Sequence, residues 1–229
     1  MRAYLQGLIP RFRTGLTAVI GWALPYLIRR SLRRGLHSVY AKGAWDALPS
    51  GGVLLAANHH TWWDLYLAWS IGQRLKRPLS GLILPETLRQ FPFFRSIGAV
   101  PTTELREVLR RLGRGELVVV FPEGELRPAG PVGTLEPGLT FLAGRARVPV
   151  YPVAIRAVMR GAERPEVFLA LGGPVEPSEV AAALTALLAG LGADLRRSDP
   201  ERPPAGFVRW SGGVGSTNER TSWVSRWLG

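Results

Sequence analysis

Short apolar runs recur along the chain from residue 53 onward, and polar segments separate them. Valine and leucine dominate these runs, and their length is that of a buried strand rather than of a helix. The predicted strands are Val53–Ala57, Leu79–Leu84, Ala99–Pro101, Leu117–Phe121, Val150–Arg156 and Glu166–Leu171.

Helical segments are predicted between these strands. Thr102 or Thr103 is placed to cap one of them, because a side-chain oxygen accepts hydrogen bonds from N–H groups of the first turn. The predicted helices are Leu65–Leu75, short pieces within Glu86–Ile97 interrupted by Pro92, a segment ending at Leu112, Gly138–Arg147 and Val180–Leu191. Strands that alternate with helices predict an α/β domain with a mixed, largely parallel sheet flanked by helices.

The first 44 residues form a basic segment around an apolar run. No acidic residue precedes Asp46, and arginines stand on both sides of Gly15–Ile28, which contains Trp22 and Tyr26. This run is shorter than the roughly 20 residues that span a bilayer, and Pro25 interrupts it. We therefore expect one or two amphipathic helices in the membrane interface, with arginines on lipid headgroups. The alternative is a helix that packs on the domain and exposes a basic face.

Composition changes again toward the C-terminus. From Ser198 onward proline, glycine, serine and arginine dominate, which is typical of a disordered tail. Trp210, Trp223 and Trp227 are too apolar for a wholly solvated tail, so we expect them to dock on the domain or in lipid. The predicted organisation is a membrane-interface segment 1–44, an α/β domain 45–195 and a tail 196–229.

Composition and charge narrow the classes of function. The chain has 229 residues, enough for one domain with its own core, and no cysteine, which excludes disulfides, thiolate metal sites and a cysteine nucleophile. The formal net charge of +12 suggests an anionic partner, unless it reflects a general bias toward arginine. The chain contains no recognisable nucleic-acid-binding motif, and its N-terminal arginines flank an apolar run. We therefore expect membrane lipids as partners and no nucleic acid.

A polar segment, Asn58–Asp64, lies between a predicted strand and a predicted helix. Histidine suits general-base chemistry near neutral pH, and a carboxylate that accepts its second ring N–H fixes the tautomer. His59 and Asp64 meet if the chain turns from strand into helix between them, and the pair would then activate a bound hydroxyl for attack on an acyl carbon. The alternative is that the histidines cap the next helix and Asp64 stabilises its first turn.

A second segment, Phe121–Gly124, directly follows the most valine-rich predicted strand. Ligands of open α/β sheets bind beyond the carboxyl ends of strands. Gly124 would let the backbone approach a substrate, and Glu123 would hold a polar head group or an arginine. The alternative is an ordinary turn from strand to loop.

Together these segments resemble the glycerolipid acyltransferases typified by lysophosphatidate acyltransferase, the PlsC family. Its Asn-His-x4-Asp block is matched by Asn58, His59 and Asp64, its Phe-Pro-Glu-Gly block by residues 121–124, and its Val-Pro-Val-x-Pro-Val strand by residues 148–153. The resemblance covers roughly residues 39–173.

The resemblance implies transfer of a fatty acyl group from acyl-CoA or acyl-carrier protein to a hydroxyl of a lipid acceptor, of the 1-acylglycerol-3-phosphate type. It implies a peripheral or monotopic protein on the cytoplasmic face of the cell membrane, with no metal and no cofactor besides the acyl donor. His59 would be the base, Asp64 its orienting carboxylate, and Glu123, Gly124 and Arg127 would form the acceptor site. A metal-dependent hydrolase is a poorer fit, because the chain has only three histidines.

The chain departs from the family pattern where that pattern supplies arginines for the acceptor's phosphate. Gly98–Glu104 stands in place of a Gly-x-x-Phe-x-x-Arg-like block. Glu125 and Leu126 replace the Thr and Arg that tend to follow Phe-Pro-Glu-Gly, and Arg127 comes one place late. A phosphate beside Glu125 without a close arginine is disfavoured, although Arg106 and Arg127 would restore binding if loops bring them near. The alternatives are a non-phosphorylated acceptor such as a glycolipid, and a non-catalytic relative that binds anionic membranes.

Overall fold

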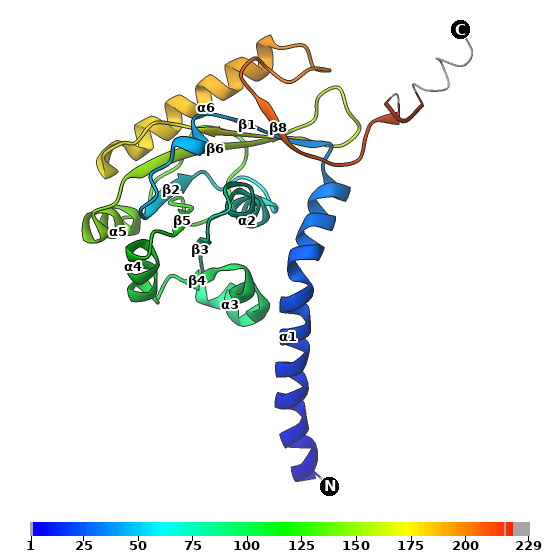
Figure 1. Ribbon diagram of the computed structural model, residues 1–229, viewed down its shortest axis with the longest axis vertical. Helices are drawn as coiled ribbons and strands as arrows, with labels where there is room; N and C mark the ends of the chain where they lie inside the picture. The colour runs from blue at the N-terminus through cyan, green and yellow to red at the C-terminus, as the bar shows by residue number, and fades with distance from the viewer. Residues whose placement is uncertain (1, 218, 222–229) are drawn as a thin grey trace.

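An eight-stranded sheet forms the centre of this computed structural model, which describes residues 2–217 and 219–221 (Figure 1). The strand order is β4-β3-β5-β2-β6-β7-β1-β8. Neighbours are parallel except for the β6–β7 and β1–β8 pairs, which are antiparallel. The strands are β1 (Ser38–Lys42), β2 (Val53–Ala57), β3 (Leu79–Ile83), β4 (Ala99–Pro101), β5 (Leu117–Val120), β6 (Val150–Val158), β7 (Glu166–Leu171) and β8 (Val208–Gly212).

Helices cover both faces of this sheet, which confirms the predicted α/β class with a mixed, largely parallel sheet. One face packs against α1 (Arg2–Gly35), α2 (Asp64–Leu75), α3 (Pro85–Gln90) and the 3-10 helix η2 (Pro92–Ile97). The other face packs against α4 (Leu105–Gly113), α5 (Gly138–Ala146) and α6 (Val180–Arg197). Two further 3-10 turns are η1 (Trp45–Ala47) and η3 (Pro177–Glu179).

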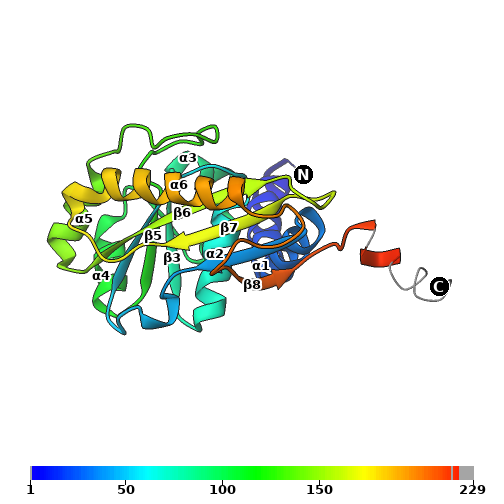
Figure 2. The ribbon, with the colours of Figure 1, turned by 90° about the horizontal axis from the view of Figure 1, so that it is seen from above.

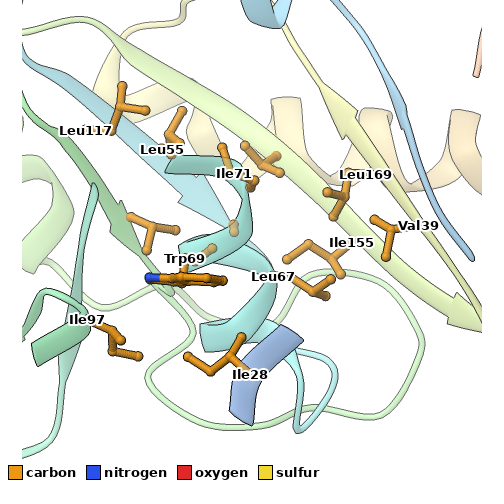
Figure 3. Close-up of a cluster of buried hydrophobic side chains, with 14 of the residues drawn as sticks. Ile28, Val39, Leu55, Leu67, Trp69, Ile71, Ile97, Leu117, Ile155 and Leu169 are labelled. Carbon is orange, nitrogen blue, oxygen red and sulfur yellow. The ribbon is translucent and has the colours of Figure 1, made fainter. Parts of the chain in front are cut away.

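The central strands are buried on both faces, which explains their continuous apolar sequences. In β2, Leu55 faces the α2 side and its neighbour Leu54 faces the α4 and α5 side, and both are fully buried. Figure 3 shows the α2 side, where Leu67, Trp69 and Ile71 lie among side chains from the strands and from α1 and η2.

Helix α1 is one continuous helix rather than two, and its C-terminal part packs on the domain. Leu24, Ile28 and Leu32 recur every fourth residue, so they share one side of the helix, and all three are buried. This part of α1 is therefore a helix that packs on the domain, which was the alternative to a helix in the membrane interface. Its N-terminal part continues beyond α3 (Figure 1), and Trp22 is 86% exposed.

The sheet extends beyond the predicted domain 45–195 in both directions. Strand β1 belongs to the predicted membrane-interface segment 1–44, and β8 belongs to the predicted tail 196–229. Trp210 of β8 packs edge-on against Trp45 with ring centroids 5.0 Å apart, so this tryptophan docks on the domain. Trp223 and Trp227 lie outside the described residues.

Helix α6 lies across β6 and β7 in Figure 2 and covers the sheet there. Together with η3 it is long and apolar enough, by length and composition alone, to cross a membrane. Val180, Leu184, Leu188 and Leu191 are nevertheless buried in the core clusters of that face. In this fold α6 is therefore a helix that covers the sheet.

Candidate active site

The two segments singled out in the sequence lie side by side at one edge of the sheet. Strands β2 and β5 are parallel neighbours, with Ala56 opposite Val120. Asn58 follows the end of β2, and Phe121 follows the end of β5. Their carboxyl ends therefore bring His59 and Glu123 to the same edge, which we call the catalytic edge.

A buried carboxylate organises the segment between β2 and α2. Asp64 is fully buried, and its Oδ2 atom lies 2.7 Å from His59 Nδ1. The same oxygen accepts the main-chain N–H groups of His60 at 2.6 Å and Thr61 at 2.9 Å, and Oδ1 accepts the Thr61 hydroxyl at 2.8 Å. Asp64 is also the first residue of α2, where the helix dipole favours a negative charge. The carboxylate therefore has four donors and is held in one orientation.

The imidazole of His59 is fixed from two directions. Its ring stacks on Phe121 with centroids 4.6 Å apart, and its Nδ1 atom is engaged by Asp64. Because an ionised carboxylate accepts hydrogen bonds and cannot donate them, this contact places the proton on Nδ1 and leaves a lone pair on Nε2. Within the described residues Nε2 makes no hydrogen bond, and the side chain is 25% exposed. The ring is thus able to accept a proton from a molecule at the catalytic edge.

The side chain of His60 takes no part in this network. Both of its ring nitrogens are buried and have no hydrogen-bond partner in the described part of the chain. Only its main-chain N–H contacts Asp64. The structure thus brings His59, and not His60, together with the carboxylate.

Glu123 fixes the main chain around His59 through hydrogen bonds. It is 5% exposed, and its two oxygens accept the N–H groups of His59 and Gly133, each at 2.9 Å. Gly124 adopts a φ of +71°, and a Cβ there would lie 3.3 Å from Glu136 Cγ, so this turn favours glycine. Both carboxylate oxygens of Glu123 thus bind protein N–H groups and position the loop, and its role in holding a polar head group or an arginine stays a prediction.

Arg127 contacts the catalytic segment through its main chain. Its N–H donates to the His59 carbonyl at 2.8 Å, and its guanidinium pairs with Glu125 at 2.6 Å. Near β4, where the family pattern has an arginine, Glu104 instead pairs with Arg95 at 2.9 Å. The cation of Arg127 is therefore close to the site but partly neutralised.

Two residues to which the sequence analysis gave no role of their own, Asn58 and Arg156, hold this loop arrangement together. The Asn58 amide bridges the main chain of Ile155 on β6, accepting from its N–H at 2.7 Å and donating to its carbonyl at 3.1 Å. Arg156, the next residue, donates to the Gly130 carbonyl at 2.6 Å. Burial lowers the pKa of Arg156, and the charge of Glu123 opposes that shift. A charged residue at the end of an apolar strand was the only sequence signal for Arg156.

The variant Glu123→Gln tests the bracing role of this side chain. One of the two N–H groups would face the amide nitrogen instead of an oxygen, so a buried hydrogen bond is lost at a cost of about 1–3 kcal/mol. We expect a lower melting temperature and a kcat about 10- to 100-fold lower, because the main chain of His59 would shift. Steady-state kinetics with a thermal melt checks both, and unchanged values would show that the brace is dispensable.

Within residues 2–217 and 219–221, no group of three or more His, Asp or Glu side chains is placed to hold a metal ion. The two buried carboxylates of this edge, Asp64 and Glu123, instead accept hydrogen bonds from groups of the chain.

Comparisons with known proteins agree with this geometry. The family model described as Acyltransferase matches residues 37–156, which is more than half of the chain. The fold is similar to that of the 1-acyl-sn-glycerophosphate (LPA) acyltransferase PlsC from Thermotoga maritima, with a TM-score of 0.57 and 21% sequence identity. The match covers 81% of this chain and 84% of that one. The resemblance inferred from three sequence blocks is thereby confirmed, and the chain belongs to the acyltransferase family with a PlsC-like fold.

Proposed function

We propose that this protein transfers a fatty acyl group from an acyl-CoA or acyl-carrier-protein thioester to a hydroxyl of a lipid acceptor. The observation that carries the proposal is the 2.7 Å contact between His59 Nδ1 and Asp64 Oδ2. It orients the imidazole and leaves Nε2 available to a substrate hydroxyl. This arrangement supports the proposed roles of His59 as the base and of Asp64 as the carboxylate that orients it.

The transfer would proceed by direct attack. Nε2 of His59 accepts the proton of the acceptor hydroxyl while the oxygen forms a bond to the thioester carbonyl carbon. The tetrahedral intermediate then expels the thiolate by breaking the C–S bond, and the imidazolium returns the proton to that sulfur. The products are an ester and a free thiol. The charge of Asp64 stabilises the imidazolium between the two proton transfers.

Release of free thiol measures this reaction directly. Acyl-CoA and acyl-carrier protein are each supplied with single lipid acceptors, and thiol is followed over time. Thiol release that depends on an acceptor supports the proposal and identifies both substrates. If folded, vesicle-bound protein releases no thiol with any acceptor, the function is instead that of a non-catalytic, membrane-binding relative.

The proposed acceptor is of the 1-acylglycerol-3-phosphate type, with Arg127 as the contact for its phosphate. The Arg127 side chain is 43% exposed, and its main chain is bonded to His59, so a phosphate near Nε2 lies within the reach of a long side chain. Its pairing with Glu125 favours the second candidate, a non-phosphorylated lipid such as a glycolipid, because Glu125 repels a phosphate.

A pair of variants separates these acceptors. We expect Arg127→Ala to raise the KM for 1-acylglycerol-3-phosphate about tenfold or more, because a charge-assisted hydrogen bond is worth about 1.5–3 kcal/mol. Glu125→Gln should lower the same KM, because it leaves Arg127 without a competing anion. If neither variant changes that KM, Arg127 does not bind a phosphate, and the non-phosphorylated acceptor is favoured.

The proposed location is the cytoplasmic face of the cell membrane, with α1 as the membrane-binding helix. The outward-facing Val19, Trp22 and Tyr26 are exposed, and aromatic side chains of this kind favour the membrane interface. Exposed arginines follow at positions 30, 33 and 34, and no acidic side chain of the described chain forms an ion pair with them. This combination suits anionic headgroups.

A further inference from the structure

We propose that the protonation state of His37 controls whether the segment after β8 is attached to the base of α1. The segment is held when His37 is protonated and released when His37 is neutral. We call this segment, residues 213–217 and 219–221, the β8 extension. The inference goes beyond the proposed function and does not depend on it, because these residues lie outside the two segments that form the catalytic edge.

The β8 extension crosses the C-terminal end of α1 (Figure 1). The N–H of Gly213 donates to the carbonyl of His37 at 2.7 Å, and the N–H of Val214 donates to the carbonyl of Leu36 at 3.1 Å. A Cβ at Gly213 would clash with the Leu36 carbonyl oxygen, so the close approach requires glycine. The extension and the end of α1 therefore meet at His37, which joins α1 to β1.

His37 is buried between two carboxylates that belong to different parts of the fold. Its Nε2 atom lies 3.0 Å from Oε2 of Glu219 in the extension, and its Nδ1 atom lies 3.4 Å from Oε1 of Glu166 at the start of β7. A neutral imidazole has one N–H group, so its second nitrogen would direct a lone pair at one of these oxygens. Only the imidazolium presents an N–H group to both carboxylates, and this geometry therefore favours protonated His37.

The contact between His37 and Glu166 depends on charge more than on a hydrogen bond. Nδ1 of His37 and Oε2 of Glu166 are both buried, and neither has a hydrogen-bond partner among the described residues. Buried polar atoms without such partners cost free energy, which the attraction between opposite charges offsets. Removing the proton from His37 removes that attraction.

Arg160 balances the charge of Glu166. It lies in the loop between β6 and β7, its side chain is 7% exposed, and its guanidinium is 3.5 Å from Glu166 Oε2. With His37 protonated and Glu219 in place, two cations accompany two carboxylates. With His37 neutral, Arg160 is the only cation of this group, and the unbalanced negative charge disfavours the approach of Glu219.

The other charged groups around His37 are exposed to solvent, which screens them. Glu163 accepts the main-chain N–H of Thr217 at 3.0 Å, so it holds the extension without contacting His37. The exposed cations lie on α1, on the loop before β7, on β8 and in the extension, and they are Arg33, Arg34, Arg164, Arg209 and Arg220. Exposed arginines stay charged throughout the range in which histidine titrates, so they do not add a pH dependence there.

The attachment should weaken as the pH rises. Glu219 stabilises the charged form of His37, so by linkage the protonation of His37 favours the held extension. Because one proton is involved, the ratio of held to released extension changes by at most about tenfold per pH unit. At the acid end, the hydrogen bond from His37 and then that from the Ser216 N–H lower the pKa of Glu219. The attachment is therefore lost again only as the pH falls through that lowered pKa.

Hydrogen exchange of the full chain measures the attachment. The protection of the amides in residues 213–221 is followed by mass spectrometry from about pH 5.5 to about pH 8.5, with correction for the intrinsic exchange rate at each pH. We expect protection to fall about tenfold between about pH 6 and about pH 8, as His37 loses its proton. Protection that stays constant over this range would overturn the proposal.

Three variants assign the pH dependence to His37. His37→Gln is never charged, so its protection at low pH should fall about tenfold and should no longer depend on pH. Glu219→Gln changes an exposed side chain that folding does not require, and it should remove most of the pH dependence. Glu163→Ala is the matched control, because it loosens Thr217 at every pH and should leave the pH dependence intact.

A pH dependence that persists in both His37→Gln and Glu219→Gln would show that another group is responsible. Loss of the pH dependence in Glu163→Ala would also contradict the proposal, because any loosening of the extension would then have the same effect.

The charge of His37 is observed directly by NMR spectroscopy. The chain has three histidines, so the ring-nitrogen signals of His37 are identified by their absence in His37→Gln. We expect both ring nitrogens to carry protons while the extension is protected, and the loss of protection to follow the same titration. A neutral His37 in the protected protein would overturn the proposal. None of these measurements needs turnover, so their outcome is independent of that of the proposed function.

Discussion

Replacing His59 with alanine should lower the rate of acyl transfer about 10²- to 10⁴-fold, because the proton acceptor that Asp64 positions is lost. Nε2 has no partner in the described chain, whereas Nδ1 is held by Asp64, so no other ring atom is placed to serve. The loss should fall on kcat rather than on the KM of either substrate. Thiol release from an acyl-CoA in the presence of the responding lipid measures it.

The neighbouring histidine provides a matched control for this variant. His60→Leu removes a ring whose two nitrogens are buried without partners, and it keeps the main-chain N–H that contacts Asp64. We expect transfer close to the wild-type rate and an unchanged or raised melting temperature, since an unsatisfied buried polar group is removed. A loss in His60→Leu with activity retained in His59→Ala would reverse the assignment of the base.

The strands that carry the site were predictable because they are buried on both faces. For that reason the sequences of β2 and β5 are uninterrupted apolar runs. The two motifs, Asn58–Asp64 and Phe121–Gly124, directly follow the ends of these strands. Strands β1 and β8 gave a weaker signal. β8 is an edge strand whose residues remain mostly exposed, and β1 directly follows an arginine-rich helix, so its few apolar residues were assigned to the basic segment.

The packing of α1 was visible in the sequence but was outweighed by another signal. Leu24, Ile28, Leu32 and Leu36 have the four-residue spacing of a buried helix face. The prediction gave more weight to Pro25 and to the surrounding arginines, which suggested broken helices in an interface. Arginines on the outer side of a docked helix produce the same composition, so charge alone does not distinguish the two arrangements.

Within the site, local pairs were predictable and long-range pairs were not. The spacing of His59 and Asp64 anticipated their contact, because both belong to one turn between a strand and a helix. The bonding of Glu123 to Gly133 depends on how a Gly- and Pro-rich loop folds back, which the spacing does not reveal. The salt bridge between Arg127 and Glu125 is the exception among local pairs: the two residues are close in sequence, but their pairing was not predicted, and it changes what that arginine offers a substrate.

Asp64→Asn should lower both the rate of acyl transfer and the free energy of unfolding. The loss of stability distinguishes this variant from His59→Ala. The Asp64 carboxylate accepts from His59, His60 and Thr61 and is fully buried. An asparagine amide is neutral and has a single acceptor oxygen. Three donors bind Oδ2 and the Thr61 hydroxyl binds Oδ1, so the amide loses the charge that strengthens these bonds and its NH2 group takes the place of one of the two oxygens. We expect an activity loss of about 10⁴-fold, as when the carboxylate of a catalytic histidine is lost elsewhere. The free energy of unfolding should fall by about 2–4 kcal/mol.

Chemical denaturation and thiol release, measured on the same protein, test both parts of this prediction. Asp46→Asn is the control, because Asp46 is an exposed carboxylate in η1 and should change neither quantity. Because His59 and Asp64 act as a unit, the double variant should be no slower than the slower single variant. Full stability in Asp64→Asn with activity lost would limit this carboxylate to orienting the imidazole. Activity retained in an unstable Asp64→Asn protein would mean that the stacking of His59 on Phe121 is enough to hold the ring in place.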